Sequence, residues 1–446
     1  MGIVMRRRDF IRSSALAGIA LGLVPPVRMS RAERNDRLQI GVIGCNGMGW
    51  SNTVSLLNMN DVDVVAICDV DRAVIERRLN DYRVLRDNRP GVYGDYRELL
   101  ERADIDAVVI GTPDHWHCRQ MVDAVKAGKH VYVEKPVANS IEECQVMLEA
   151  ATASGKVVQT GQWQRSGPHY RRARDIVRSG VLGDIRLVKT WAYQGWMKPV
   201  PVKPDGTPPK GVDYAMWLGP APMRPFNPNR FHFNFRWFWD YAGGLMTDWG
   251  VHEIDVALWV LGATTPRSVM ASGSIAHRDD AAETPNTLQA VFEYPRFNIL
   301  WEHATGIDLG SYRLPEGIAF IGNNGTLVVH RGGFAVYSER EFVGWGREGP
   351  PKMDPIEGGH PPEGVSYLDL HTRNFIDAIK ASDPKLLNTP IESGSLAAIN
   401  AQMGNIAYRT GDKIFWNDET SAFVDNPAAN ELARAHYHNG WTTSGE

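Results

Sequence analysis

Five short apolar runs between Leu38 and Gly161 constrain the fold of this chain more than any other feature. They read LQIGVIG, VDVVAICD, DAVVIGTP, KHVYVEKP and KVVQTG, and helix-like segments such as 120–127 and 141–154 separate them, each closed by a glycine. Apolar strands that do not alternate with polar residues, connected by helices, favour a parallel sheet covered on both faces. The sequence therefore predicts an α/β fold that begins with a doubly wound parallel sheet.

The composition changes after Gly161. A proline-rich loop, MKPVPVKPDGTPPKG, is followed by strand-like pieces, RSVMASGSI, TLQAVFEY and GTLVVH, that are typical of an open, mainly antiparallel sheet. Two helix-like segments, YLDLHTRNFIDAIKAS and SLAAINAQMGNIAYRTG, come near the end. Since 446 residues exceed one ordinary core, we expect a first domain at 36–160, a second, α+β domain at 161–420 and a tail at 421–446.

The first thirty-four residues have the pattern of a signal peptide. A basic start precedes a weakly apolar run from Ala15 to Val24, which is too short for a stable membrane span. The segment resembles the twin-arginine consensus at Arg7, Arg8, Phe10, Ile11 and Arg12, with Arg6 in place of the usual Ser or Thr. The pattern predicts recognition by the twin-arginine export machinery and a periplasmic or otherwise exported protein; the alternative is a frayed basic N-terminus.

Charge and cysteine content exclude several classes of protein. The formal net charge is −4 and no Lys/Arg run lies within the folded part, so a nucleic-acid partner is not expected. The four cysteines form no CxxC pair. Because the twin-arginine route carries proteins already folded in a reducing compartment, we expect free buried thiols rather than disulfides.

A glycine loop follows the first apolar run, in IGVIGCNGMGWSN. The dinucleotide fingerprint uses glycines for a tight turn, for close approach of the backbone to a pyrophosphate and for helix packing. Asn46 takes its middle glycine position, and Asp69 ends the second run, where an acid accepts from the ribose hydroxyls of NAD and repels the 2′-phosphate of NADP. The loop predicts a Rossmann domain that binds NAD through Gly44, Asn46, Gly47, Met48, Gly49 and Asp69.

GTPDHWHCRQ ends another strand at the edge of the sheet that carries the ligand crevice. Thr112, Pro113, His115 and His117 are therefore expected to line the cofactor. A metal site is the alternative for the two histidines. They lack a neighbouring carboxylate or thiol constellation, so no metal is predicted.

VYVEKPVA ends an apolar strand with an acid, a base and a proline. Lys135 at this edge is placed to hydrogen-bond a substrate oxygen and relay a proton, with Glu134 beside it. Asp248 and His252 are four residues apart in GGLMTDWGVHEIDVALWVLG, which has helical spacing, and His252 can accept a hydroxyl proton. Taken singly, each pair is also typical of an ordinary surface charge pair.

Together, the glycine loop with Asp69, TPDHWH, AGKHVYVEKP and the helix with Asp248 and His252 resemble the Gfo/Idh/MocA oxidoreductase family, the group of glucose-fructose oxidoreductase and inositol dehydrogenase. The resemblance implies catalytic roles for Lys135, Asp248 and His252, a second domain that mediates homo-oligomers (a dimer or tetramer), and a sugar or cyclitol substrate. Aromatic rings stack on sugar faces and polar neighbours bind hydroxyls. The candidate substrate contacts are Trp163, Arg165, Trp191, Tyr193, His232, Arg236 and Trp237.

Three functions remain open at this point. The first is an exported oxidoreductase that transfers hydride between a secondary hydroxyl and tightly bound NAD. The second is an NAD-dependent glycoside hydrolase that transiently oxidises its sugar. The third is a non-catalytic sugar or dinucleotide sensor, against which stand Lys135 and the Asp248/His252 pair.

Overall fold

The structure is a computed structural model that describes residues 37–276 and 279–443. The predicted signal peptide at residues 1–34 lies outside the described residues. Among the described helices, none combines the length and the hydropathy that a membrane crossing requires.

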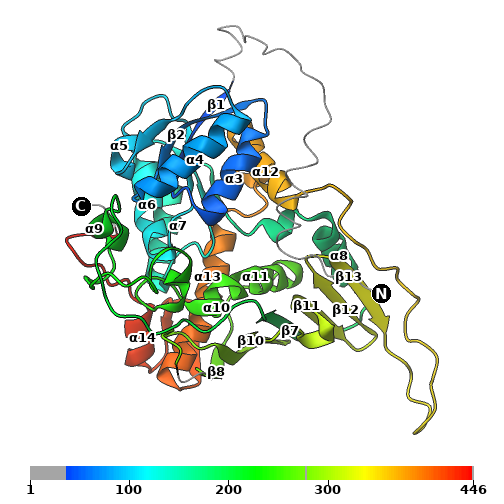
Figure 1. Ribbon diagram of the computed structural model, residues 1–446. Coiled ribbons are helices and arrows are strands. Elements are labelled where there is room, and N and C mark those ends of the chain that lie inside the picture. The colour runs from blue at the N-terminus through cyan, green and yellow to red at the C-terminus, as the bar shows by residue number, and fades with distance from the viewer. Residues whose placement is uncertain (1–36, 277–278, 444–446) are drawn as a thin grey trace. The chain divides into compact units, whose positions relative to one another are not determined.

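The first sheet has six strands, all parallel, in the order β3-β2-β1-β4-β5-β6 (Figure 1). Five of these strands match the apolar runs of the sequence; the short β3 was not predicted. The strands are β1 (Leu38–Ile43), β2 (Val62–Cys68), β3 (Gly91–Tyr93), β4 (Ala107–Ile110), β5 (His130–Val133) and β6 (Val158–Thr160). The helices between them are α3 (Gly47–Leu57), α4 (Arg72–Leu85), α5 (Tyr96–Leu100), α6 (Asp114–Lys126) and α7 (Ile141–Ser154).

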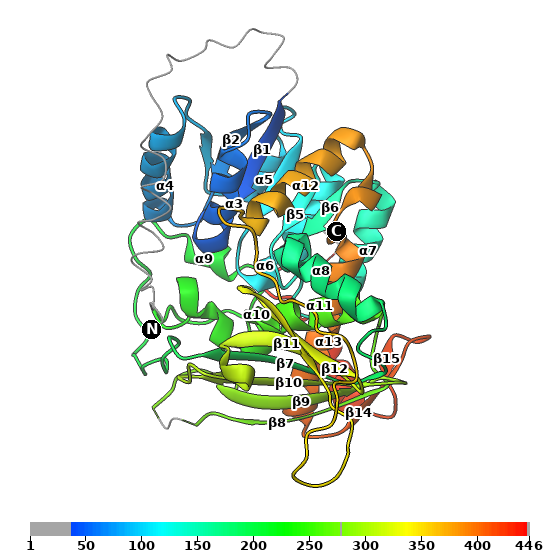
Figure 2. The same cartoon turned by 90° about the vertical axis from the view of Figure 1, so that its right-hand side faces the viewer.

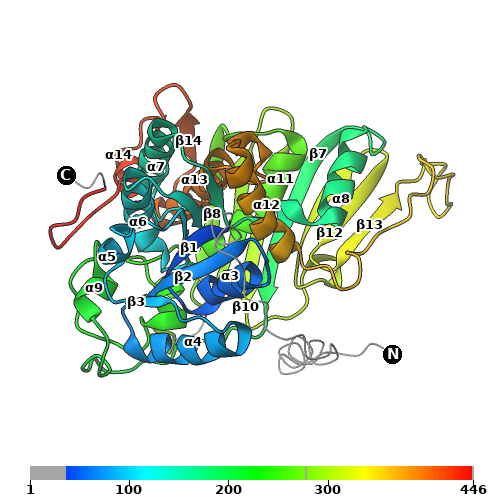
Figure 3. The ribbon, with the colours of Figure 1, turned by 90° about the horizontal axis from the view of Figure 1, so that it is seen from above.

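Both faces of this sheet are covered, because its strands are apolar on both sides. One face packs against α5, α6 and α7, and the other against α3 and α4. The second face also receives α12 (Tyr367–Ala381), whose Phe375 and Ile376 are buried beside Ile40 and Val42 (Figure 3). A helix from the later part of the chain thus completes the first core.

The second sheet has nine strands in the order β13-β12-β11-β7-β10-β9-β8-β14-β15. Only β7 and β10 pair in parallel; the other neighbours are antiparallel. The open, mainly antiparallel sheet is therefore confirmed. Its strands are β7 (Ile185–Gln194), β8 (Ser268–Ser274), β9 (Thr287–Glu293), β10 (Asn298–Thr305), β11 (Glu316–Gly322), β12 (Gly325–His330), β13 (Gly333–Ser338), β14 (Ile414–Asn417) and β15 (Ala422–Phe423).

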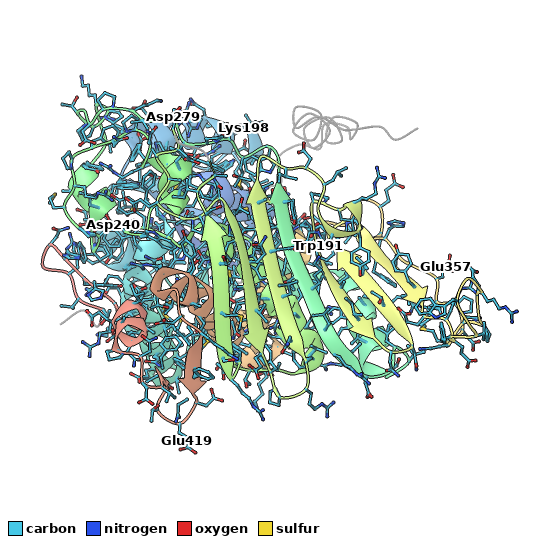
Figure 4. The ribbon with its side chains drawn as sticks, turned by 90° about the horizontal axis from the view of Figure 1, so that it is seen from below. Trp191, Lys198, Asp240, Asp279, Glu357 and Glu419 are labelled. Carbon is cyan, nitrogen blue, oxygen red and sulfur yellow. The ribbon has the colours of Figure 1, made fainter. Side chains whose placement is uncertain are left out.

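Helices cover one face of the second sheet. Figure 2 shows α10, α11 and α13 over β7 to β10, and residues from α11 and α13 form one buried cluster with these strands. The opposite face is seen in Figure 4, where Trp191 lies within the sheet. The helices of this part of the chain are α8 (Pro168–Arg178), α9 (Tyr214–Leu218), α10 (Gly244–Asp248), α11 (Gly250–Leu261), α13 (Ile391–Thr410) and α14 (Pro427–Ala433).

The segment expected to form one helix around Asp248 and His252 is divided into two. α10 ends at Asp248, and α11 begins at Gly250 after Trp249, which caps both. Asp248 and His252 therefore do not occupy successive turns of one continuous helix. As predicted, all four cysteines are free and buried.

Candidate active site

A cavity of about 270 Å³ opens at the carboxyl ends of β1, β2, β4 and β5. These ends supply the glycine loop, Asp69, Thr112 and Lys135 to its wall, since parallel strands place their C-terminal residues at one edge of the sheet. The second half of the chain closes the opposite side with Met216, Trp217, His232, Phe233, Phe235, Arg236 and Asp248. The structure thus brings residues more than a hundred positions apart to one site.

The glycine loop has no room for side chains at two positions. A Cβ atom on Gly49 would lie 1.9 Å from the Gly44 carbonyl oxygen, and one on Gly44 would lie 2.7 Å from the Gly111 backbone. Positive φ angles occur at Gly44 and Gly47, whereas Asn46 is extended with φ −103°. Asparagine is therefore compatible with the middle position, because the left-handed turn occurs one residue later. The Asn46 side chain instead accepts a hydrogen bond from Arg78.

These residues fit a dinucleotide. Helix α3 begins without a side-chain cap, so its first N–H groups remain available to a pyrophosphate. Asp69 accepts hydrogen bonds from the Cys45 and Asp71 N–H groups at 2.9 and 3.0 Å, which fixes its carboxylate at the cavity wall. Residues 44–49 would hold the pyrophosphate of NAD, and Asp69 the adenosine ribose.

Lys135 lies in the centre of a network of opposite charges. Its ammonium donates to the Asp248 carboxylate at 2.8 Å and to the Asp248 carbonyl at 2.9 Å, and Arg236 lies 3.3 Å from the other carboxylate oxygen. Burial alone would raise the pKa of Asp248, but Arg236 and Lys135 outweigh it and lower the pKa to about 2. Asp248 is thus an anion that holds the ammonium in place.

His252 is buried beside this pair, and no described residue accepts from or donates to its Nδ1. Burial, followed by the charges of Lys135 and Arg331, lowers its pKa well below the ordinary value. Trp163 and Trp249 pack edge-on against its ring, with centroids 5.9 and 6.3 Å away. The imidazole is therefore neutral and held in position.

Two further predicted residues support the lysine. Glu134 is buried and accepts from Asn52 at 2.8 Å, and burial raises its pKa. His117 lies between the carbonyl oxygens of Pro136 and Thr112, at 2.7 and 2.9 Å, and so connects the loops that follow β4 and β5. His115 does not line the cavity, because its ring packs beneath Trp217 and Tyr241.

The substrate candidates divide into two groups. His232 and Arg236 line the cavity, although His232 faces Asp71 at 2.9 Å. Trp163 does not line it but packs against His252. Arg165 is committed to a bidentate pair with Asp255, and Trp237 is buried in the core. Trp191 and Tyr193 pack on the far side of the nine-stranded sheet from α11 (Figure 4). These four were selected for residue type, and none of them lines the cavity.

Two charged residues at or near the site, Asp114 and Arg331, were not selected from the sequence, and neither were aromatic wall residues such as Trp217 and Phe235. Asp114 lies within TPDHWH and lines the cavity; burial raises its pKa to about 8, and the charge of Asp248 adds to this while Lys135 and Arg236 oppose it. An acidic residue directly after Pro113, at the end of a predicted strand, could have identified Asp114 as a site residue from the sequence. Arg331 stands in the turn between β12 and β13, and no motif there marks it. Within the described residues, no group of three His, Cys, Asp or Glu side chains could hold a metal.

The doubly wound sheet, the glycine loop and the Lys135–Asp248 pair define an α/β fold with a dinucleotide-type site at the edge of its first sheet. The model for the NAD-binding Rossmann fold of the Gfo/Idh/MocA oxidoreductase family matches residues 38–162, and the model for that family's C-terminal alpha/beta domain matches residues 169–301. Together the two matches cover more than half of the chain. The chain belongs to the Gfo/Idh/MocA oxidoreductase family.

Individual proteins show the same relationship. A glycosyl hydrolase family 109 protein of Shewanella sp. (strain ANA-3) is 32% identical in an alignment of 183 residues, and the match covers 38% of this chain and 39% of that relative. A levoglucosan dehydrogenase solved with NADH and levoglucosan has a TM-score of 0.63 at 17% identity and covers 85% of this chain and 99% of its own. The scyllo-inositol dehydrogenase of Lactobacillus casei, solved with NAD(H) and scyllo-inositol, has a TM-score of 0.60 at 21% identity, with coverages of 85% and 99%. The chain thus spans less than half of the curated relative, and the solved structures share its fold.

Proposed function

We propose that this protein transfers hydride between a secondary hydroxyl of a sugar or cyclitol and NAD held in the cavity. One observation carries the proposal. An ammonium group has three N–H donors, and Lys135 directs two of them to Asp248, at 2.8 and 2.9 Å. The third N–H donor of Lys135 can therefore bind a substrate oxygen. Lys135 lies at the same edge of the sheet as the glycine loop, which would hold the cofactor.

In this proposal, the cofactor, Lys135 and His252 have different roles. NAD bound here accepts or returns the hydride. Lys135 holds the hydroxyl oxygen and stabilises the negative charge that develops on it, because its own position is fixed by Asp248. His252, neutral and with Nδ1 unpartnered, takes the hydroxyl proton as hydride leaves carbon. The names of the levoglucosan and scyllo-inositol dehydrogenases support a polyhydroxylated ring as substrate.

A second candidate is an NAD-dependent glycoside hydrolase, favoured by the glycosyl hydrolase relative at 32% identity. Transient oxidation of the sugar would acidify the adjacent C–H, and elimination would release the aglycone as its alcohol and leave a double bond. Addition of water to that double bond and re-reduction of the ketone by the same cofactor would complete hydrolysis with no net redox change. The same Lys135 and His252 would serve both activities. The products separate them: a keto-sugar with reduced cofactor, or a free aglycone alone.

Export is a separate part of the proposal, and it rests on the twin-arginine pattern at residues 1–34. An exported enzyme has no pool of free nicotinamide cofactor, so it would carry NAD out and recycle it in place. We also propose a homo-oligomer formed through the uncovered face of the nine-stranded sheet, where Leu187, Met270 and Tyr337 are exposed.

The test uses protein purified without added cofactor. Near-ultraviolet absorbance is followed while free sugars, inositols and aryl glycosides are added. A reduced-nicotinamide band that grows and persists supports the oxidoreductase, and release of the aryl group without such a band supports the hydrolase. If neither occurs although NAD is bound, the proposed function is wrong.

A further inference from the structure

Arg331 is a cation at the site that no predicted role explains. It stands in the turn between β12 and β13, and its guanidinium carbon lies 4.6 Å from the centroid of the Trp163 ring and 4.3 Å from that of Trp249. Two indole rings thus cover the flat guanidinium and fix its orientation. The N–H donors lie at the edge of this flat group.

The guanidinium faces the catalytic group. Trp249 directly follows Asp248, and both indole rings also pack against His252. The positive charge of Arg331 contributes to the lowered pKa of Asp248 and of His252, which places it within electrostatic reach of both. A substrate held between Lys135 and His252 would therefore have Arg331 beside it.

The described residues leave the guanidinium short of acceptors. Its one side-chain hydrogen bond is long, 3.4 Å from Nη2 to the Gln164 amide oxygen, and its buried Nε has no acceptor among residues 37–276 and 279–443. No carboxylate of these residues lies within ion-pair distance of it, although Glu253 and Glu316 are close enough to interact electrostatically. A buried charged donor without an acceptor is costly, so a ligand that supplies one gains affinity.

The two neighbouring acids do not neutralise Arg331 directly. Burial, and then the charge of Glu316, raises the pKa of Glu253 well above its ordinary value, which weakens it as a counter-ion for Arg331. Glu316 uses one carboxylate oxygen to accept from the Arg331 backbone N–H at 2.9 Å, and not from its guanidinium. Apart from the 3.4 Å contact of Nη2 with Gln164, the guanidinium therefore has no acceptor among the described residues.

Trp163 is not free to stack a sugar. Tyr367 packs against its ring with centroids 4.8 Å apart, in addition to the Arg331 contact. The aromatic residue that seemed suited to a neutral pyranose face therefore serves to hold a cation in place.

We propose that Arg331 binds a carboxylate of the substrate, so that the preferred substrate is a sugar acid such as a hexuronic acid or its glycoside. A planar guanidinium matches a carboxylate with two parallel N–H···O bonds. The inference rests on the proposed function, because it places the anion beside the hydroxyl that Lys135 holds. It adds the substrate class, which the fold and the family match leave open.

The test compares matched ligands on the full-length protein loaded with NAD. Hexuronic acids and their methyl glycosides are paired with the corresponding neutral hexoses and with the uronate methyl esters, and both kcat/KM and binding by calorimetry are measured. We expect the acid to be preferred by about tenfold to a hundredfold over its neutral partner. Arg331→Gln should remove that preference mainly through KM, and Arg331→Lys should restore part of it. Arg186→Gln, an exposed arginine on β7, is the matched control and should keep the preference.

Each outcome decides a different claim. Turnover of neutral sugars with no preference for the acid, or a preference that survives Arg331→Gln, overturns the inference and leaves the proposed function standing. A preference for a sugar sulfate or phosphate over the carboxylate also overturns the assignment to a sugar acid. Absence of any turnover refutes the proposed function, and Arg331-dependent binding of the uronate by calorimetry then still tests the anion site.

Discussion

Asp114→Asn offers a quantitative test of the electrostatics at the site. The side chain is buried in the cavity wall, and burial raises its pKa from the ordinary 3.8 to about 8. Between these two pH values the folded protein keeps a proton that the unfolded chain has lost. The free energy of unfolding therefore falls as pH rises from about 4 to about 8, and it is unaffected by this group above that range.

The size of the effect follows from the shift. Each pH unit between the two pKa values is worth about 1.4 kcal/mol, so the wild type loses up to about 4 kcal/mol between pH 5 and pH 8 through this group alone. Water in the cavity screens part of this, and we expect about 2 to 4 kcal/mol. Asparagine carries no such charge. The stability of the variant relative to the wild type should therefore increase by that amount over the same range.

The assay is urea unfolding of both proteins at pH 5, 6, 7 and 8, followed by tryptophan fluorescence. Only the difference between the two proteins is used, which cancels the titration of all other groups. Asp87→Asn, at an exposed aspartate, is the control and should give a difference that does not change with pH. A difference for Asp114→Asn that is equally flat would refute the assignment of a protonated buried carboxyl.

Three further changes test other parts of the site. Lys135→Met should lower kcat by about a thousandfold or more while NAD binding, measured by fluorescence titration, changes little, since the lysine acts on the reacting oxygen; a sensor would keep its ligand response. Gly49→Ala should abolish NAD binding and destabilise the fold by about 3 kcal/mol or more, because its Cβ would lie 1.9 Å from a carbonyl oxygen; Gly206→Ala, which has open space, should do neither. Trp441→Ala should speed NAD dissociation in stopped-flow fluorescence by about tenfold, since Trp441 packs edge-on against Trp116 of the cavity wall at 4.9 Å; an unchanged rate would show that this contact does not retain the cofactor.

Local features of the sequence were sufficient to predict much of the first domain. β1, the glycine loop and α3 are contiguous, and their apolar run, tight turn and helix start are set by neighbouring residues. The strand β3 was missed because its three residues are too few to give a pattern. The break at Trp249 was missed because the apolar spacing continues through it, whereas the backbone turns there to direct Asp248 toward Lys135.

The sequence by itself determined the Rossmann domain, the cofactor loop and the lysine at the strand end, since each depends on residues close together in the chain. The tertiary structure alone decided that Asp248 pairs with Lys135 across 113 positions and that α12 completes the first core. It also decided that Arg165 is committed to Asp255, whereas no acid of the described part of the chain forms an ion pair with Arg331. The charges and pKa values of the site residues are likewise set by the tertiary structure. The physical reason is that burial and ion pairing depend on which distant segments meet, and residue type does not reveal the partner.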